Sequence, residues 1–305
     1  MTHDSILVPL DGSQLAEAVV PMAARLATSL QASVTLLHVL EDDAPSEIHG
    51  EQHLSEAVTA QAYLEQIAGH LTTAGVTAVE VHVHENREHD VAQAIVQHSQ
   101  EFDTSLIMLA NHGSGGWREF FFGKIAQQVI RRGTVPVIMI PMRDATDAPL
   151  PRPTRIAMAL NGKAESAAAL EPTIWIARGY GVPVHVMVAV ETIGTMTGGE
   201  RAVASLVPSA TRAVLEIQQD ERRIYAEDVV AQLEAQGVEA TSVVLRGDPA
   251  SAIVAEAARV DAGLLVLVTH GRSELEGVWT GSVGTRVLSR YGKPLLLVHA
   301  PDVQD

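Results

Sequence analysis

The chain has 305 residues, no cysteine and a formal net charge of −16 at pH 7. Such a length favours two domains, and the absence of cysteine excludes disulfides and thiolate metal sites. The acidic balance argues against nucleic acid or an anionic membrane as the partner, because phosphate groups bind basic surfaces. No secretory signal is recognisable, and no apolar run reaches the roughly 20 residues of a membrane helix, so we expect a cytoplasmic protein.

In chain order, the first half alternates apolar strands with helices. Apolar runs predict strands at Ser5–Leu10, Ser33–Leu40, Leu106–Leu109 and Pro136–Ile140, and an alternating run predicts an edge strand at Val79–His84. Apolar residues at helical spacing predict helices at Gln14–Leu30, Leu54–Ala74, Asp90–Gln100 and Lys124–Arg132. Strands and helices in alternation indicate βαβ units and a parallel sheet.

The same pattern restarts after a proline-rich stretch. Residues 141–154 contain four prolines, which predicts domains at 1–142 and 155–305 joined by a linker at 143–154. Ile156–Glu191 aligns with Ile6–Glu41 without gaps at an offset of 150 (residue 156 against residue 6), and later segments align at 158 (residue 252 against residue 94). We place the extra residues in a Gly-, Thr- and Ser-rich excursion at Thr192–Ala213. A repeat of this size indicates duplication.

Each half also contains a glycine turn between a strand and a helix. The turns are His112-Gly113 and His270-Gly271, and each is followed by a second glycine, Gly123 or Gly281, before the helix. Backbone N–H groups at such a turn can bind an anion.

Three features together resemble the universal stress protein family: the segment ILVPLDGS at Ile6–Ser13, the helix carrying Ala16-Glu17, and the glycine turn before a Val-Pro-Val strand. The resemblance covers nearly the whole chain as a tandem of two domains. It implies an α/β fold of adenine nucleotide alpha hydrolase-like type, with two doubly wound five-stranded parallel sheets of order 3-2-1-4-5. It also implies that the halves dock as an intramolecular pseudo-dimer through Pro136–Ile140 and Pro294–His299, and a further homodimer stays open.

Some family members bind ATP through a motif G-x2-G-x9-G-[S/T], so the resemblance implies an adenine nucleotide site, with Mg²⁺, in each half. The positions in the first half are Pro9, Asp11, Val39, Ala110, Gly113, Gly123 and Lys124. Those in the second half are Asn161, Ala189, Val268, Gly271, Gly281 and Ser282. Ala110 and Val268 replace the leading glycine, Lys124 replaces the hydroxyl, and Asn161 replaces the aspartate.

The first half is the better candidate on physical grounds. An ammonium group at Lys124 is a point-charge partner for phosphate, and its contribution of roughly 1.5–3 kcal/mol can offset the loss of a glycine at Ala110. Asn161 lacks the charge of Asp11. Two structural alternatives stay open: the glycines only shape a turn, and Asp11-Gly12-Ser13 only caps a helix.

We predict no metal site and no catalytic residue. His82, His84 and His89 suggest a metal cluster, but the alternation of the strand makes His82 and His84 its wetter face. The predicted function is therefore stress response, with adenine nucleotide binding for sensing or signalling. The alternatives are a stress adaptor that acts through oligomer or partner surfaces, and a nucleotide-dependent α/β enzyme with slow ATP hydrolysis and a pocket at the excursion.

Overall fold

The structure is a computed structural model that describes residues 4–41, 47–48, 51–52, 54–88, 90–112, 124–142, 151–190, 208–269 and 283–300. Its contacts divide the chain into two units. The first consists of Met1–Arg152 with Lys293–His299, and the second of Pro153–Gly292 with Ala300–Asp305. Residues 143–150 of the predicted linker lie outside the described residues.

The first unit is built on five parallel strands in the order β5-β2-β1-β6-β7. Their bounds are β1 Ser5–Pro9, β2 Ser33–Glu41, β5 Val79–Glu88, β6 Leu106–His112 and β7 Val137–Met142. Its helices are α1 Gln14–Glu17, α2 Val20–Leu30, α3 Ala57–Thr73, α4 Val91–Glu101 and α5 Lys124–Arg132, and two-residue strands β3 Glu47–Ile48 and β4 Glu51–Gln52 form a separate antiparallel pair.

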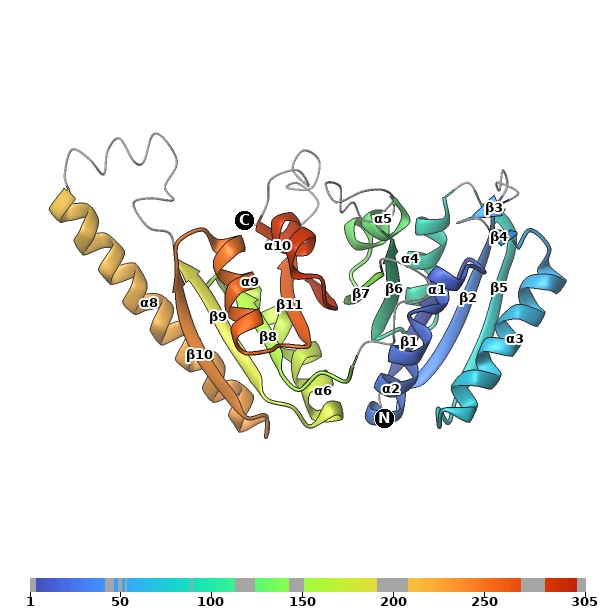
Figure 1. Ribbon diagram of the computed structural model, residues 1–305, viewed down its shortest axis with the longest axis horizontal. Coiled ribbons are helices and arrows are strands. Elements are labelled where there is room, and N and C mark those ends of the chain that lie inside the picture. Colours follow the sequence, from blue (N-terminus) through green and yellow to red (C-terminus); the bar gives the residue numbers. More distant parts are fainter. Residues whose placement is uncertain are drawn as a thin grey trace. The chain divides into compact units, whose positions relative to one another are not determined.

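Helices cover both faces of this sheet (Figure 1). Helices α2 and α3 pack on each other, and so do α4 and α5. Consecutive residues of β1 point to opposite faces, yet Ile6, Leu7 and Val8 are all 0% exposed. This burial explains why the central strands read as continuous apolar runs rather than as alternating ones.

The predicted helix at Gln14–Leu30 is wrong as a single element, because it is divided into α1 and α2. The Ser13 side chain accepts from the backbone N–H of Ala16 and caps α1, and Pro21 stands in the first turn of α2. Proline lacks an N–H and has a fixed φ, so it fits the start of a helix and not its interior.

The second unit repeats the arrangement with parallel strands in the order β10-β9-β8-β11. Their bounds are β8 Ile156–Leu160, β9 Val184–Val190, β10 Ala240–Arg246 and β11 Leu264–Thr269. The helices are the 3-10 helix η1 Ala164–Ala169, α6 Leu170–Tyr180, α8 Pro208–Ala235, α9 Pro249–Arg259 and α10 Val283–Tyr291. The excursion predicted at Thr192–Ala213 is too long, since α8 begins at Pro208, a residue suited to a first helical turn.

The contacts group the last strand, β12 Leu295–His299, with the first unit, where it lies antiparallel to β7. The predicted α/β fold, with a doubly wound and mostly parallel sheet in each half, is confirmed. This pairing involves one strand only, so the docking of the two repeats as a pseudo-dimer stays a prediction. Among the described helices, none is long and apolar enough to cross a membrane.

Candidate functional site

The strand order reverses at the first strand of each unit. In the first unit the chain passes from β1 to β2 on one side, and β6 then lies on the other side of β1. In the second unit β8 has the same place between β9 and β11. Ligands of open α/β sheets bind outside the carboxyl ends of the strands at such a switch point. The sheet topology therefore selects the carboxyl ends of the central strands in each unit as the candidate site, and this side of the sheet is called the edge below.

The described candidate residues gather at these two edges. In the first unit, Pro9 ends β1 opposite Leu37, Val39 lies further along β2, and Ala110 lies near the end of β6. In the second unit, the corresponding residues are Asn161 after β8, Ala189 on β9 and Val268 on β11. Gly113, Gly123, Gly271, Gly281 and Ser282 lie outside the described residues, as does the side chain of Lys124, the first residue of α5.

Asp11 is held in a turn that starts the first helix. Its Oδ1 accepts from the backbone N–H of Ser13 at 2.9 Å and from the Ser13 hydroxyl at 2.7 Å. The Ser13 oxygen in turn accepts from the N–H of Ala16 at 3.1 Å. An ionised carboxylate offers about four acceptor positions, so these two bonds leave capacity for a ligand. The helix-capping interpretation is confirmed for Ser13, and Asp11 supports it.

Asn161 forms the same turn without the charge. Its Oδ1 accepts from the backbone N–H of Lys163 at 2.9 Å and from the Ser166 hydroxyl. Lys163 has no side-chain cap to offer, and the following residues form the 3-10 helix η1. The aspartate and the asparagine therefore produce matching turns, and they differ mainly in charge.

Sequence reasoning missed the side chain that covers the turn in the first unit. Gly12 has a φ of +91°, and a Cβ there would lie 2.7 Å from Leu54 Cδ1. Leu54 is tied down by His38, which is 1% exposed and contacts the carbonyl oxygens of Leu10 through Nδ1 at 2.8 Å and of Leu54 through Nε2 at 3.0 Å. The one sequence signal was a histidine inside an apolar strand, because a buried polar group needs a partner.

An arginine has the matching place in the second unit. Gly162 has a φ of +74°, and a Cβ there would overlap the guanidinium of Arg222 from α8. Arg222 Nη1 donates to the Gly162 carbonyl oxygen at 2.7 Å. The two edges thus differ in chemistry: an aliphatic side chain lies beside Asp11, and a cation lies beside Asn161.

Comparisons with known proteins agree with the fold. The model of the universal stress protein family matches residues 2–141 and 153–299. Universal stress protein YxiE of Bacillus subtilis is 23% identical over 149 residues, which are 45% of this chain and 98% of YxiE.

Two solved structures are similar over both repeats. A universal stress protein from Archaeoglobus fulgidus has a TM-score of 0.68 at 16% identity, covering 98% of this chain and 99% of its own. A functionally unknown protein from Pseudomonas aeruginosa has a TM-score of 0.69 at 18% identity, covering 98% and 93%. At such identities these two structures show the fold alone. Since the family match extends over most of both halves, the chain belongs to the universal stress protein family.

Proposed function

We propose that the first unit binds an adenine nucleotide, ATP with Mg²⁺, and that this binding serves sensing or signalling in a stress response. The observation that carries the proposal is the position of Asp11, Val39 and Ala110 at one sheet edge, where the strand order reverses. Asp11 is only partly exposed and its orientation is set by Ser13, so the carboxylate is arranged before any ligand arrives.

The residues at this edge match the parts of a nucleotide. The Asp11 carboxylate is an acceptor for ribose hydroxyl groups, and the partly exposed Leu54 provides apolar surface for a base, whereas Val39 is only 6% exposed. Helix α5, Lys124–Arg132, follows β6, and its first N–H groups with the Lys124 ammonium suit phosphate oxygens. Each part of the ligand thus has a partner of suitable chemistry within the first unit.

We propose weaker nucleotide binding for the second unit. Asn161 has no charge, and the smaller Ala189 stands where Val39 does. The branched Val268 replaces Ala110 near the end of the strand that precedes the glycine turn. Asn161 thus weakens the hydrogen bond to a ligand, Ala189 reduces the apolar contact, and Val268 reduces the room for a ribose.

We further propose binding without appreciable turnover. Asp11, the carboxylate that follows β1, already accepts two hydrogen bonds from Ser13, which leave its Oδ1 less available to accept a proton from an attacking water. Slow ATP hydrolysis is the most that we allow. A product assay for ADP on the full chain, with Mg²⁺ and ATP, tests this part directly, since rapid multiple turnover would contradict it.

Isothermal titration calorimetry of the full chain with Mg²⁺ and ATP tests the binding. The informative variant is Asp11→Asn, because Asn161 shows that an asparagine closes the same turn. A hydrogen bond to a charged group contributes about 1.5–3 kcal/mol, so the affinity should fall roughly tenfold to a hundredfold while the unfolding midpoint stays unchanged.

Two further variants complete the design. Gly113→Val should abolish binding by obstructing the glycine turn, and Asn161→Asp should leave the affinity of the first site unchanged. If the wild-type chain gives no heat with ATP, the nucleotide site is refuted and the adaptor function is favoured. If wild type and Asp11→Asn bind ATP with equal affinity, the Asp11 carboxylate does not contribute to the site.

A further inference from the structure

A cluster of three histidines lies on one face of the first unit. His82 and His84 are two residues apart on β5, so their side chains share a face of this edge strand. His98 reaches the same place from α4, and one nitrogen atom of each ring lies within 4.8 Å of those of the other two. The predicted wetter face is therefore covered by a helix, and His89 of the predicted trio lies outside the described residues.

The rings of the cluster are held by specific contacts. His84 Nδ1 lies 2.9 Å from His98 Nε2, and His98 Nδ1 lies 2.8 Å from Glu101 Oε2. Phe102 stacks on the His98 ring at a centroid distance of 5.2 Å and an interplanar angle of 12°. Gln97 Nε2 donates to Glu101 Oε1 at 2.8 Å. The orientation of the His98 ring is thus constrained by its neighbours.

These contacts prepare His98 as a metal ligand. The Glu101 carboxylate lies beside Nδ1 of His98, and Nε2, the other nitrogen of the ring, lies toward His84. Metal-binding histidines almost always have a carboxylate, carbonyl or water beside their other nitrogen, as His98 has Glu101.

The spacing of the rings fits a tetrahedral ion. Zinc–nitrogen bonds of about 2.0–2.1 Å place two ligand atoms about 3.4 Å apart in a tetrahedral site. Here His84 Nδ1 and His98 Nε2 lie 2.9 Å apart, and the three ligand atoms all lie within 4.8 Å of one another. Small side-chain rotations on β5 therefore suffice. Since His82 and His84 are partly exposed, an ion can enter from solvent and keep a water as its fourth ligand.

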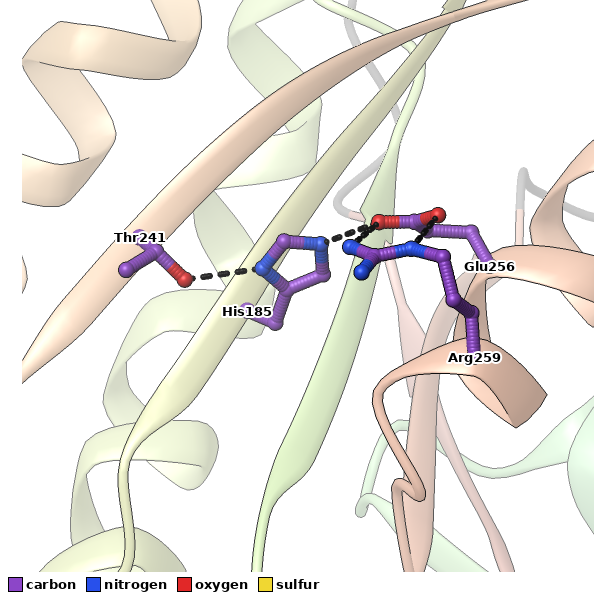
Figure 2. Close-up of polar contacts among 4 residues, drawn as sticks. All are labelled: His185, Thr241, Glu256 and Arg259. Carbon is purple, nitrogen blue, oxygen red and sulfur yellow. Dashed lines mark hydrogen bonds and ion pairs between the residues drawn. The ribbon is translucent and has the colours of Figure 1, made fainter.

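The second unit shows that the cluster is not a packing device common to both repeats. At the offset of 158 residues (256 against 98, 259 against 101), Glu256 stands for His98 and Arg259 stands for Glu101. Figure 2 shows that Arg259 donates to both oxygens of Glu256, through Nε at 2.7 Å and Nη2 at 2.6 Å. Glu256 Oε1 also contacts His185 Nε2 at 2.8 Å, and Thr241 Oγ1 contacts His185 Nδ1 at 2.8 Å.

The contact between α4 and β5 in the first unit and that between α9 and β9 in the second unit therefore differ in charge. In the second unit a guanidinium balances the carboxylate, and both nitrogens of the one imidazole, His185, have protein partners. In the first unit three imidazoles converge beside one carboxylate, Glu101. A divalent cation suits the arrangement in the first unit, because imidazole nitrogens and a nearby carboxylate stabilise such an ion.

We propose that His82, His84 and His98 bind one zinc-class divalent ion in the first unit, with Glu101 as the positioning carboxylate. The site is separate from the proposed nucleotide site in its residues and in its ligand. It requires no change in the backbone, because both elements that supply the ligands are already packed together.

Calorimetric titration of ZnCl₂ into the untagged, chelator-treated full chain without nucleotide tests the proposal. We expect one strong site per chain, with binding weakened at least a hundredfold in His82→Gln and in His84→Gln. Both positions are partly exposed, so these variants should fold, as circular dichroism can verify. His70→Gln, an exposed histidine on α3, is the matched control and should bind as the wild type does.

Two further readouts separate a built site from loose surface binding. Glu101→Gln should weaken Zn²⁺ binding roughly tenfold to a hundredfold, because it acts only through His98. Co²⁺ should give the visible absorption bands of a four-coordinate ion in the wild type and lose them in His84→Gln. The absence of a strong Zn²⁺ site in the wild type, or its survival in both His82→Gln and His84→Gln, would overturn the proposal.

Discussion

Replacing Gly12 with alanine measures how tightly Leu54 closes the turn beside Asp11. Alanine at a φ of +91° is strained by about 1–2 kcal/mol, because its Cβ crowds the backbone in the left-handed region. The new Cβ would also lie 2.7 Å from Leu54 Cδ1 and 2.8 Å from Leu54 Cγ. Overpacking of this kind costs a further 1–3 kcal/mol or so. We expect Gly12→Ala to lower the free energy of unfolding of the first unit by about 2–5 kcal/mol.

Gly75 provides the matched control, since it has nearly the same backbone conformation without the crowding. Its φ is +98°, and a Cβ there would meet Thr28 at 3.9 Å, an ordinary contact. Gly75→Ala should therefore cost only the strain of about 1–2 kcal/mol. The gain from a stiffer unfolded chain is common to both variants and cancels in the comparison.

Urea denaturation followed by circular dichroism gives both free energies, because the two glycines belong to the same unit. In a Leu54→Ala background, Gly12→Ala should lower the free energy of unfolding only by the backbone strain, because the crowding side chain is gone. Equal costs for Gly12→Ala and Gly75→Ala would refute the inferred contact between Leu54 and the turn.

Three further variants probe packing, charge and hydrogen bonding, each by urea denaturation. Leu64→Ala, at a position that is 0% exposed, should cost about 2–5 kcal/mol, whereas Ile217→Ala, 59% exposed, should change stability by no more than about 0.5 kcal/mol. A hydrogen bond from Arg259 is the main cause that lowers the pKa of Glu256 from 4.5 to about 2. The stability of the second unit should therefore fall as the pH drops from 4.5 toward 2. A Glu256→Gln variant with the same pH dependence as the wild type would contradict this. Tyr291→Phe removes a hydroxyl that donates to a main-chain carbonyl at 2.7 Å and should cost about 0.5–1.5 kcal/mol; an unchanged midpoint would show that the bond is not formed in solution.

Local patterns in the sequence predicted most of the strands and helices of the first half and their order. Continuous apolar runs predicted the buried strands, and the self-alignment of the chain predicted the duplication. The turn at Asp11-Gly12-Ser13 was also readable, since a capping side chain bonds to N–H groups only two or three residues away. The division of the first helix was missed, although Pro21 indicated it.

Contacts between distant segments were beyond this kind of reasoning. Leu54 covers Gly12 from more than 40 residues away, and Arg222 reaches Gly162 across 60 residues from a helix whose start the sequence misplaced. Hydrophobic periodicity says that a helix buries a face, but not which side chains of the neighbouring strand that face will meet.

The histidines of β5 illustrate the same division. The sequence by itself determined a duplicated α/β protein with an alternating edge strand, because spacing and capping depend on neighbours along the chain. Only the tertiary structure decided that His98 meets His82 and His84, while the equivalent helix of the second unit brings Glu256 and Arg259 to His185. Which side chains share a seam depends on how a helix packs across two strands, and that is set by the whole fold.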